Sequence, residues 1–232
     1  MLNKMIFSTL TALLMTFAVL NTSVAGPVFG GGCGGKGKCG YDMGLLSEDE
    51  IYGLQYMREE EKLARDIYLI MSDEHELIIF KTIARSEDKH MAAVKNLLDK
   101  YDIKDPAEDE TPATEGEDFT NKDLGEDFEY FKIEGLKSPM DALQVGGEIE
   151  EIDMADLRKE ILLADNTDII STYENLLCGS RNHLRAFVRQ LELRGGSYDP
   201  LELEDDELAA IVEPTIATKC GYQKKSATMK DK

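Results

Sequence analysis

Residues 80–101 read FKTIARSEDKHMAAVKNLLDKY and carry the clearest structural pattern in the sequence. Read at alternating spacings of three and four, it gives one stripe: Phe80, Ile83, Glu87, His90, Val94, Leu97 and Tyr101. Residues at these spacings share one face of a helix, so the stretch predicts a helix with a buried apolar stripe. Glu87 and His90 interrupt that stripe at its middle. Burying such groups is costly unless they are paired or bind a metal ion.

Three other stretches repeat this pattern of an apolar stripe with a polar residue near its middle. The first has Glu61 at that position, the third has Glu150 and the fourth has His183. We expect helices over residues 48–71, 77–101, 139–164 and 168–194. If these helices pack antiparallel, the five polar side chains meet at one height. The sequence therefore predicts an all-α, antiparallel four-helix bundle with a long crossover between the second and third helices.

Capping signals support these boundaries. Ser47 lies three residues before Glu50, which is a capping box, and Ser138-Pro139 opens the third helix with a cap and a first-turn proline. Residues 165–167 break the chain before the fourth helix, which the glycines at 195 and 196 end. Residues 104–120 predict a solvated linker because they are rich in Pro, Asp, Glu and Thr. Short helices are expected within 123–133 and 198–212.

Carboxylate oxygens and imidazole nitrogens suit iron, manganese or zinc, so the five residues are candidate metal ligands. Several carboxylates around one cavity repel each other, and two divalent cations would remove that repulsion. Protons or internal ion pairs could do the same. Glu61 follows two other glutamates, any of which could be a surface charge, and the register of Glu150 could slip to a neighbour. His183 could be a satisfied core histidine.

These residues carry a family resemblance. Residues 84–90 (ARSEDKH), and Glu61 seven residues before Tyr68, resemble the first half of rubrerythrin, bacterioferritin and ferritin sites. Residues 56–66 (YMREEEKLARD), 173–177 (YENLL) and 179–187 (GSRNHLRAF) are similar to the domain-of-unknown-function family 2202, which is ferritin-like. The resemblance covers roughly residues 45–212. It implies a bundle that holds two divalent metal ions, usually iron, with manganese and zinc as alternatives.

The resemblance also implies roles for single residues. Glu61 and His90 would be terminal ligands, Glu87 a bridging ligand and Glu150 the carboxylate of the third helix. His183 would mirror His90, and Tyr68 would form a hydrogen bond within the site. Ser180 departs from the pattern, because it stands where a second bridging glutamate is expected. The site is then asymmetric, short of one carboxylate, or completed by Glu151 or Asp153.

The ends of the chain indicate export. Residues 1–25 have an early Lys4, an apolar run and a small-x-small sequence at 23–25, which is the pattern of a signal peptide. We expect a Gly-rich leader over 26–46, the helical domain over 47–212 and a tail over 213–232. The protein is then secreted or periplasmic, without membrane insertion of the mature chain. A net charge of −20 disfavours nucleic-acid binding and favours cations.

The four cysteines suggest disulfides in an exported protein. Pairing of Cys33 with Cys39 and of Cys178 with Cys220 is one of three connectivities. Three functions remain open: a diiron oxidoreductase acting on peroxide or dioxygen as a peroxidase or metal oxidase, a metal-binding or storage protein without turnover, and a metal-free structural bundle of the cell envelope. We expect a monomer or homodimer.

Overall fold

The computed structural model describes residues 46–201 and 203–213, which contain helices and no strand. The six α-helices are α1 (Glu48–His75), α2 (Ile78–Tyr101), α3 (Lys122–Gly135), α4 (Pro139–Leu163), α5 (Thr167–Glu192) and α6 (Asp205–Val212), and a 3₁₀ turn, η1, spans Gly116–Asp118. This confirms the predicted all-α class. The predicted signal peptide, leader and tail lie outside the described residues, apart from Leu46 and Glu213. None of the described helices is both long and apolar enough to span a bilayer.

The predicted caps are present at the starts of α1 and α4. The Ser47 hydroxyl accepts from the Glu50 N–H at 3.1 Å, and the Glu50 carboxylate accepts from the Ser47 N–H at 3.0 Å. Ser138 caps α4, and Pro139 occupies its first turn. Glu50 also accepts the backbone N–H of Asn166 at 2.8 Å, so it joins the start of α1 to the start of α5. α1 continues one turn beyond the predicted end at residue 71.

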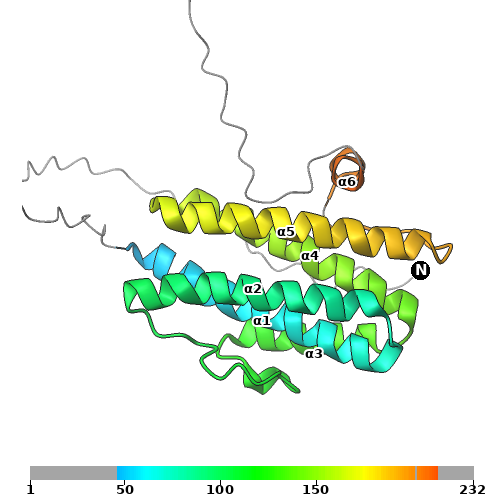
Figure 1. Ribbon diagram of the computed structural model, residues 1–232, viewed down its shortest axis with the longest axis horizontal. Helices are drawn as coiled ribbons and strands as arrows, with labels where there is room; N and C mark the ends of the chain where they lie inside the picture. Colours follow the sequence, from blue (N-terminus) through cyan, green and yellow to red (C-terminus); the bar gives the residue numbers. More distant parts are fainter. Residues whose placement is uncertain (1–45, 202, 214–232) are drawn as a thin grey trace, which may run out of the picture. The chain divides into compact units, whose positions relative to one another are not determined.

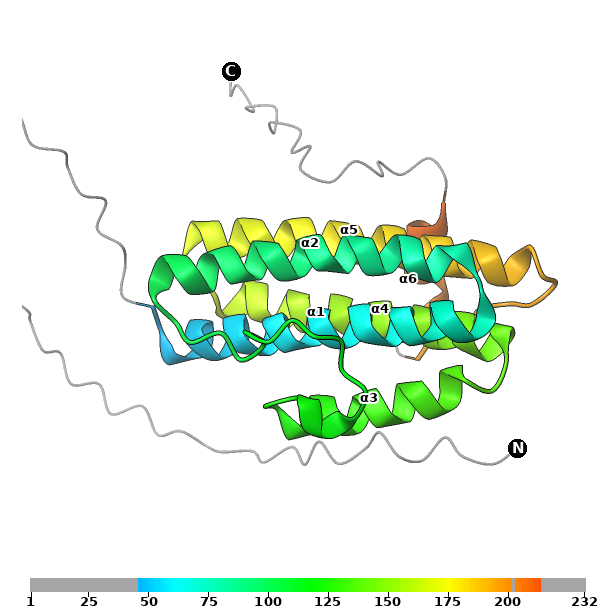
Figure 2. The same cartoon turned by 60° about the horizontal axis from the view of Figure 1, so that its bottom comes forward.

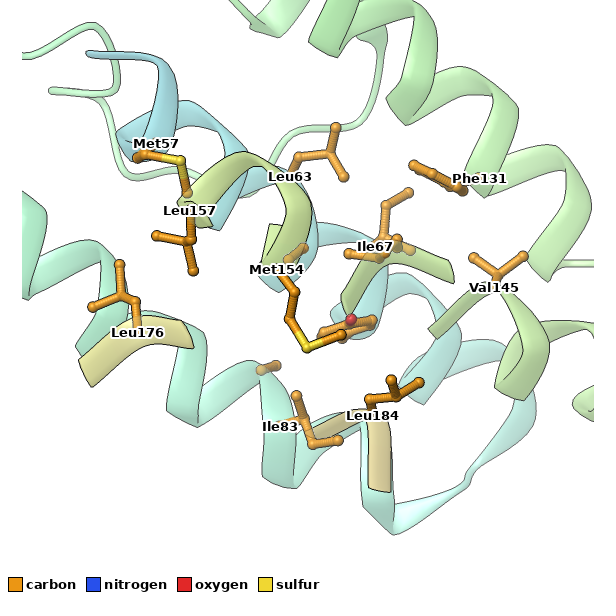
Figure 3. Packing of buried hydrophobic residues seen from close by; sticks show 14 of the residues in the cluster. Met57, Leu63, Ile67, Ile83, Phe131, Val145, Met154, Leu157, Leu176 and Leu184 are labelled. Carbon is orange, nitrogen blue, oxygen red and sulfur yellow. The ribbon is translucent and has the colours of Figure 1, made fainter. Parts of the chain in front are cut away.

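The four long helices pack as two neighbouring pairs, α1 with α2 and α4 with α5 (Figure 1). α1 also contacts α4 and α2 contacts α5, so the four helices enclose a shared interior. α3 lies along α1 and α4 (Figure 2), and α6 contacts α5. Apolar side chains from all four long helices meet inside, among them Met57, Ile83, Met154, Leu157 and Leu176 (Figure 3).

Most of the predicted solvated linker over 104–120 is exposed, as expected, but the segment is also anchored to the helical domain. Ala107, Ala113 and Phe119 are buried, and backbone groups of this crossover bond to α1 side chains. α1 provides buried charges that fix it there: the Arg58 guanidinium donates to the Asp105 carboxylate at 3.1 Å and to the Ala107 carbonyl at 3.2 Å. The acidic residues that suggested a solvated segment partly serve as partners for these buried cations.

Cys178, on α5, is disulfide-bonded. Its partner lies outside the described residues, because the other three cysteines all fall there. Pairing with Cys220 therefore stays a prediction, and so does the pairing of Cys33 with Cys39.

Candidate metal centre

All five predicted ligands lie inside the molecule. Glu61 comes from α1, Glu87 and His90 from α2, Glu150 from α4 and His183 from α5. The three glutamates are each only 2% exposed, and His183 is 8% exposed. Glutamates are almost never buried to this degree without a partner or a cation. The stripes predicted from sequence spacing are therefore the faces that the helices turn inward.

Glu87 lies between two imidazoles at the middle of the group. Its Oε2 is 2.6 Å from His90 Nδ1, and its Oε1 is 2.8 Å from His183 Nδ1. The two rings are stacked, with centroids 5.4 Å apart and planes inclined by 29°. The Glu-x-x-His spacing on α2 gives the first contact, and packing of α5 against α2 gives the second. One carboxylate thus faces the same nitrogen of two histidines from different helices.

The remaining predicted residues surround this core. Glu61 Oε2 lies 3.2 Å from His90 Nδ1, and Glu150 Oε2 lies 3.3 Å from His183 Nδ1. The Tyr68 hydroxyl donates to Glu150 Oε1 at 2.6 Å, which fixes that carboxylate from the α1 side. Each imidazole is therefore flanked by two carboxylates, and Glu87 is the one that both share.

The donor set fits a cation. Glu87, His90 and His183 each offer one ligand atom, and these three atoms lie within 4.8 Å of one another. Glu87 Oε1 and His183 Nδ1 are close but not aligned for a hydrogen bond, and both are buried without a hydrogen-bond partner; the same holds for Glu61 Oε1. Buried polar atoms are rarely left unpaired. One carboxylate and two imidazoles around a point suit iron, manganese or zinc.

Without a cation, protons hold the group together. Burial raises the pKa of Glu87, but His183 and His90 outweigh it and lower that pKa below its usual range. Burial lowers the pKa of His183, but Glu87 and Glu150 outweigh it and raise that pKa to about 10. The pKa of His90 is likewise held well above its usual range by Glu61 and Glu87. Burial raises the pKa of Glu61 to about 7.

The Ser180 departure has a structural counterpart. Ser180, fully buried on α5, donates through its hydroxyl to Asp153 Oδ2, and the other oxygen of that carboxylate is buried without a hydrogen-bond partner. Glu151 turns away from the centre: it accepts from the Tyr198 hydroxyl at 2.7 Å and from the Leu203 N–H at 2.7 Å. Of the two residues predicted to complete the site, Asp153 lies beside it and Glu151 does not.

Two residues, Gly179 against the centre and Glu60 beside it, had no clear sequence signal. Gly179 lies against His90, because a Cβ built at residue 179 would be 2.6 Å from His90 Nε2. Glu60 is 4% exposed, and its Oε2 is buried without a hydrogen-bond partner. A glycine in a helix and the middle residue of three glutamates are both common on helix surfaces. Tyr173, on α5, could also have oriented a ligand, but it lies near Gly53 and Glu160 and not at the centre.

The fold and this group define an all-α protein with a buried carboxylate–imidazole cluster that could bind a metal ion. Residues 50–215 match the family described as "Uncharacterized protein domain (DUF2202)", and the chain belongs to this family. It is similar to "Uncharacterized protein MJ0754" of Methanocaldococcus jannaschii, at 48% identity over 167 residues, 72% of this chain and 88% of the relative. It also resembles the crystal structure of "hypothetical protein MJ0754" from Methanococcus jannaschii, with a TM-score of 0.71 and 45% identity over 77% of this chain and 99% of that chain.

Proposed function

We propose that this chain is an exported, ferritin-like protein that binds two divalent metal ions, iron first among them, and acts as an oxidoreductase on peroxide or dioxygen. The observation that supports it most strongly is the position of Glu87 between His90 and His183, buried and with atoms that lack hydrogen-bond partners. Export rests on the signal-peptide pattern of residues 1–25.

The ferritin-like assignment rests on where the ligands come from. Four long helices contribute, and the long crossover separates the first pair from the second. The ligands of the two helix pairs correspond: Glu61 on α1 has its counterpart in Glu150 on α4, and His90 on α2 has its counterpart in His183 on α5. A bundle that draws carboxylates and imidazoles inward from four helices is the usual construction of carboxylate-bridged dimetal sites.

The chain's own residues would order the site. Glu87 is oriented to bridge, because each of its oxygens faces a different imidazole. Tyr68 holds Glu150 in one orientation through its hydroxyl. Metal binding displaces protons from imidazoles, so loading would release protons and strengthen with rising pH. Bound iron would supply the electrons that reduce peroxide or dioxygen.

Two alternatives each have an observation in their favour. Ser180 provides no carboxylate where a second bridge is expected, which favours metal binding or storage without turnover. The ion pairs of Glu87 with both histidines favour a metal-free bundle, in which protons alone neutralise the buried carboxylates. Metal content distinguishes the metal-free bundle from the oxidoreductase and the storage protein. Turnover then distinguishes the oxidoreductase from the storage protein.

The test is elemental analysis of the purified protein after reconstitution with ferrous iron, beside a Glu87→Ala, His90→Ala double variant. We expect two metal ions per chain in the wild type and loss of both in the variant. An Asp99→Asn variant is the matched control, since it removes one carboxylate of α2 that is exposed and paired with Lys95. Absence of bound metal in the wild type would support the structural bundle. Metal without peroxide consumption would support storage.

A further inference from the structure

A second group of acidic side chains lies beside the candidate metal centre, between α1, α3 and α4. We call it the carboxylate ladder: Asp127 on α3, Asp156 and Asp153 on α4, and Glu60 on α1. Asp127 and Asp156 are partly exposed, whereas Glu60 is 4% and Asp153 5% exposed. The ladder therefore runs from the surface under α3 toward the interior.

The two inner members of the ladder each have a buried carboxylate oxygen without a partner, although the other oxygen of Asp153 accepts from Ser180. Glu60 Oε2 and Asp153 Oδ1 are both buried, and neither has a hydrogen-bond partner. Within residues 46–201 and 203–213, no lysine, arginine or histidine forms an ion pair with any of the four carboxylates. Burying a carboxylate unpaired is unfavourable for stability. A role in folding alone therefore does not account for these residues.

The neighbours of each carboxylate give the order of the ladder. The α1–α4 pairing places Tyr56 against Asp156 and Tyr68 against Glu150, so Glu60, one turn after Tyr56, faces the turn of α4 that includes Asp153. The charges of Asp153 and Asp156 both raise the pKa of Glu60, after burial itself. The charges that act most strongly on Asp153 are those of Glu61 and Glu150. At the outer end, Asp156 accepts a hydrogen bond from the Tyr56 hydroxyl at 2.8 Å. The sequence of carboxylates thus connects the partly exposed side of α3 to two candidate ligands.

We propose that the carboxylate ladder is the route by which divalent cations enter the metal centre, with Glu60 as the transfer site in its middle. This inference rests on the proposed function, since it needs a metal centre to serve. Carboxylates without basic partners attract divalent cations, and oxygen donors suit hard cations in transit. The ladder would bind a cation weakly and pass it inward, while the imidazoles retain it.

The experiment mixes metal-free protein rapidly with Co²⁺ and follows the visible absorption that develops when cobalt binds. Glu60→Gln keeps the shape of the side chain and removes its charge, so the expected result is loading at least tenfold slower with an unchanged final stoichiometry. Asp156→Asn, at the outer end, tests the same route with a partly exposed residue. Asp99→Asn is the control and should load at the wild-type rate. Thermal unfolding checks that each variant is folded.

The outcomes are distinct. If the wild type binds Co²⁺ and Glu60→Gln fills at the same rate, the route is wrong while the metal centre stands. Loss of final stoichiometry in Glu60→Gln would also overturn the route, because it would make Glu60 a ligand. If the wild type binds no Co²⁺ at all, the proposed function fails first.

Discussion

At residue 179 only glycine, which has a hydrogen atom in place of a Cβ, leaves room for the His90 imidazole. A methyl group at residue 179 would lie 2.6 Å from His90 Nε2, so the imidazole or α5 would have to shift. We expect Gly179→Ala to weaken metal affinity about tenfold or more, since small displacements of a ligand have such effects. It should also destabilise the fold by about 1–3 kcal/mol through overpacking. Metal titration and denaturant unfolding measure the two effects.

Gly147→Ala is the control for this substitution. Its added methyl group would meet the Tyr198 ring at 2.3 Å, a comparable clash that does not involve either histidine. It should cost stability and leave metal affinity largely unchanged. Equal losses of metal affinity in the two variants would mean that the effect at residue 179 is general destabilisation.

The stability of the metal-free protein should depend on pH in a definite direction. The pKa of His183 is raised from 6.5 to about 10 in the fold, because Glu87 and Glu150 outweigh burial. A raised pKa stabilises the folded state fully below pH 6.5, and this contribution disappears as pH rises toward 10. The raised pKa of Glu61, about 7, acts in the same direction at lower pH. We expect the free energy of unfolding to fall by on the order of a few kcal/mol.

Urea unfolding in the presence of a chelator, at several pH values from 6 to 10, measures this change. His183→Gln should show a weaker dependence on pH, because it removes a histidine whose raised pKa of about 10 makes it lose its proton towards the upper end of that range. Stability that rises over this range in the metal-free wild type would contradict the assigned protonation of the pair.

Between elements, the crossover depends on α1 through buried charges. Asp66 is fully buried and accepts from Lys62 Nζ at 2.8 Å, from Arg65 Nε at 2.6 Å and from the Ala113 N–H at 2.8 Å. Glu59 accepts the backbone N–H groups of residues 120 and 121. The interface between the crossover and α1 therefore depends on buried charges as well as apolar contacts. Removing one charged partner would leave the other buried and unpaired, which is strongly destabilising.

Asp66→Asn should therefore destabilise the protein by about 3 kcal/mol, because it leaves the buried Lys62 without a carboxylate and removes the nearer carboxylate of Arg65. The crossover should also open locally, which limited proteolysis within residues 104–120 would detect. Asp99→Asn, which breaks only an exposed pair, should change stability by less than about 1 kcal/mol. A crossover that stays protected in Asp66→Asn would mean that its apolar contacts suffice.

The helices could be predicted from the sequence because their signals are local. Caps at Ser47 and Ser138, and apolar stripes of period 3.6, place all four long helices within about one turn of the observed ends. The anchoring of the crossover could not be predicted in this way. Its acidic composition correctly indicates exposure for most of its residues, but only the tertiary structure reveals that Arg58 donates to the Ala107 carbonyl and that Lys62 lies over the Phe119 ring.

The candidate ligands could also be predicted from a local pattern, the apolar stripe of each helix, whereas Glu60 could not. Glu87 and His90 stand out because they interrupt an apolar stripe, and their partners follow from the other stripes. Glu60 gave no such signal, because neighbouring residues on a helix normally face different directions, yet Glu59, Glu60 and Glu61 are all buried. α1 is covered by the crossover, α3 and α4 as well as α2, so it has almost no exposed face at that height.

Across the whole molecule, both the net charge of −20 and the buried carboxylates favour the binding of positive charge. In the interior, His90 and His183 can provide it only by taking protons, and a metal ion would provide it without them. The most direct measurement is anomalous diffraction from crystals grown with excess iron or manganese. We predict anomalous density within bonding distance of Glu87, His90 and His183. Well-ordered crystals without density there, and with both histidines still paired to Glu87, would contradict the account.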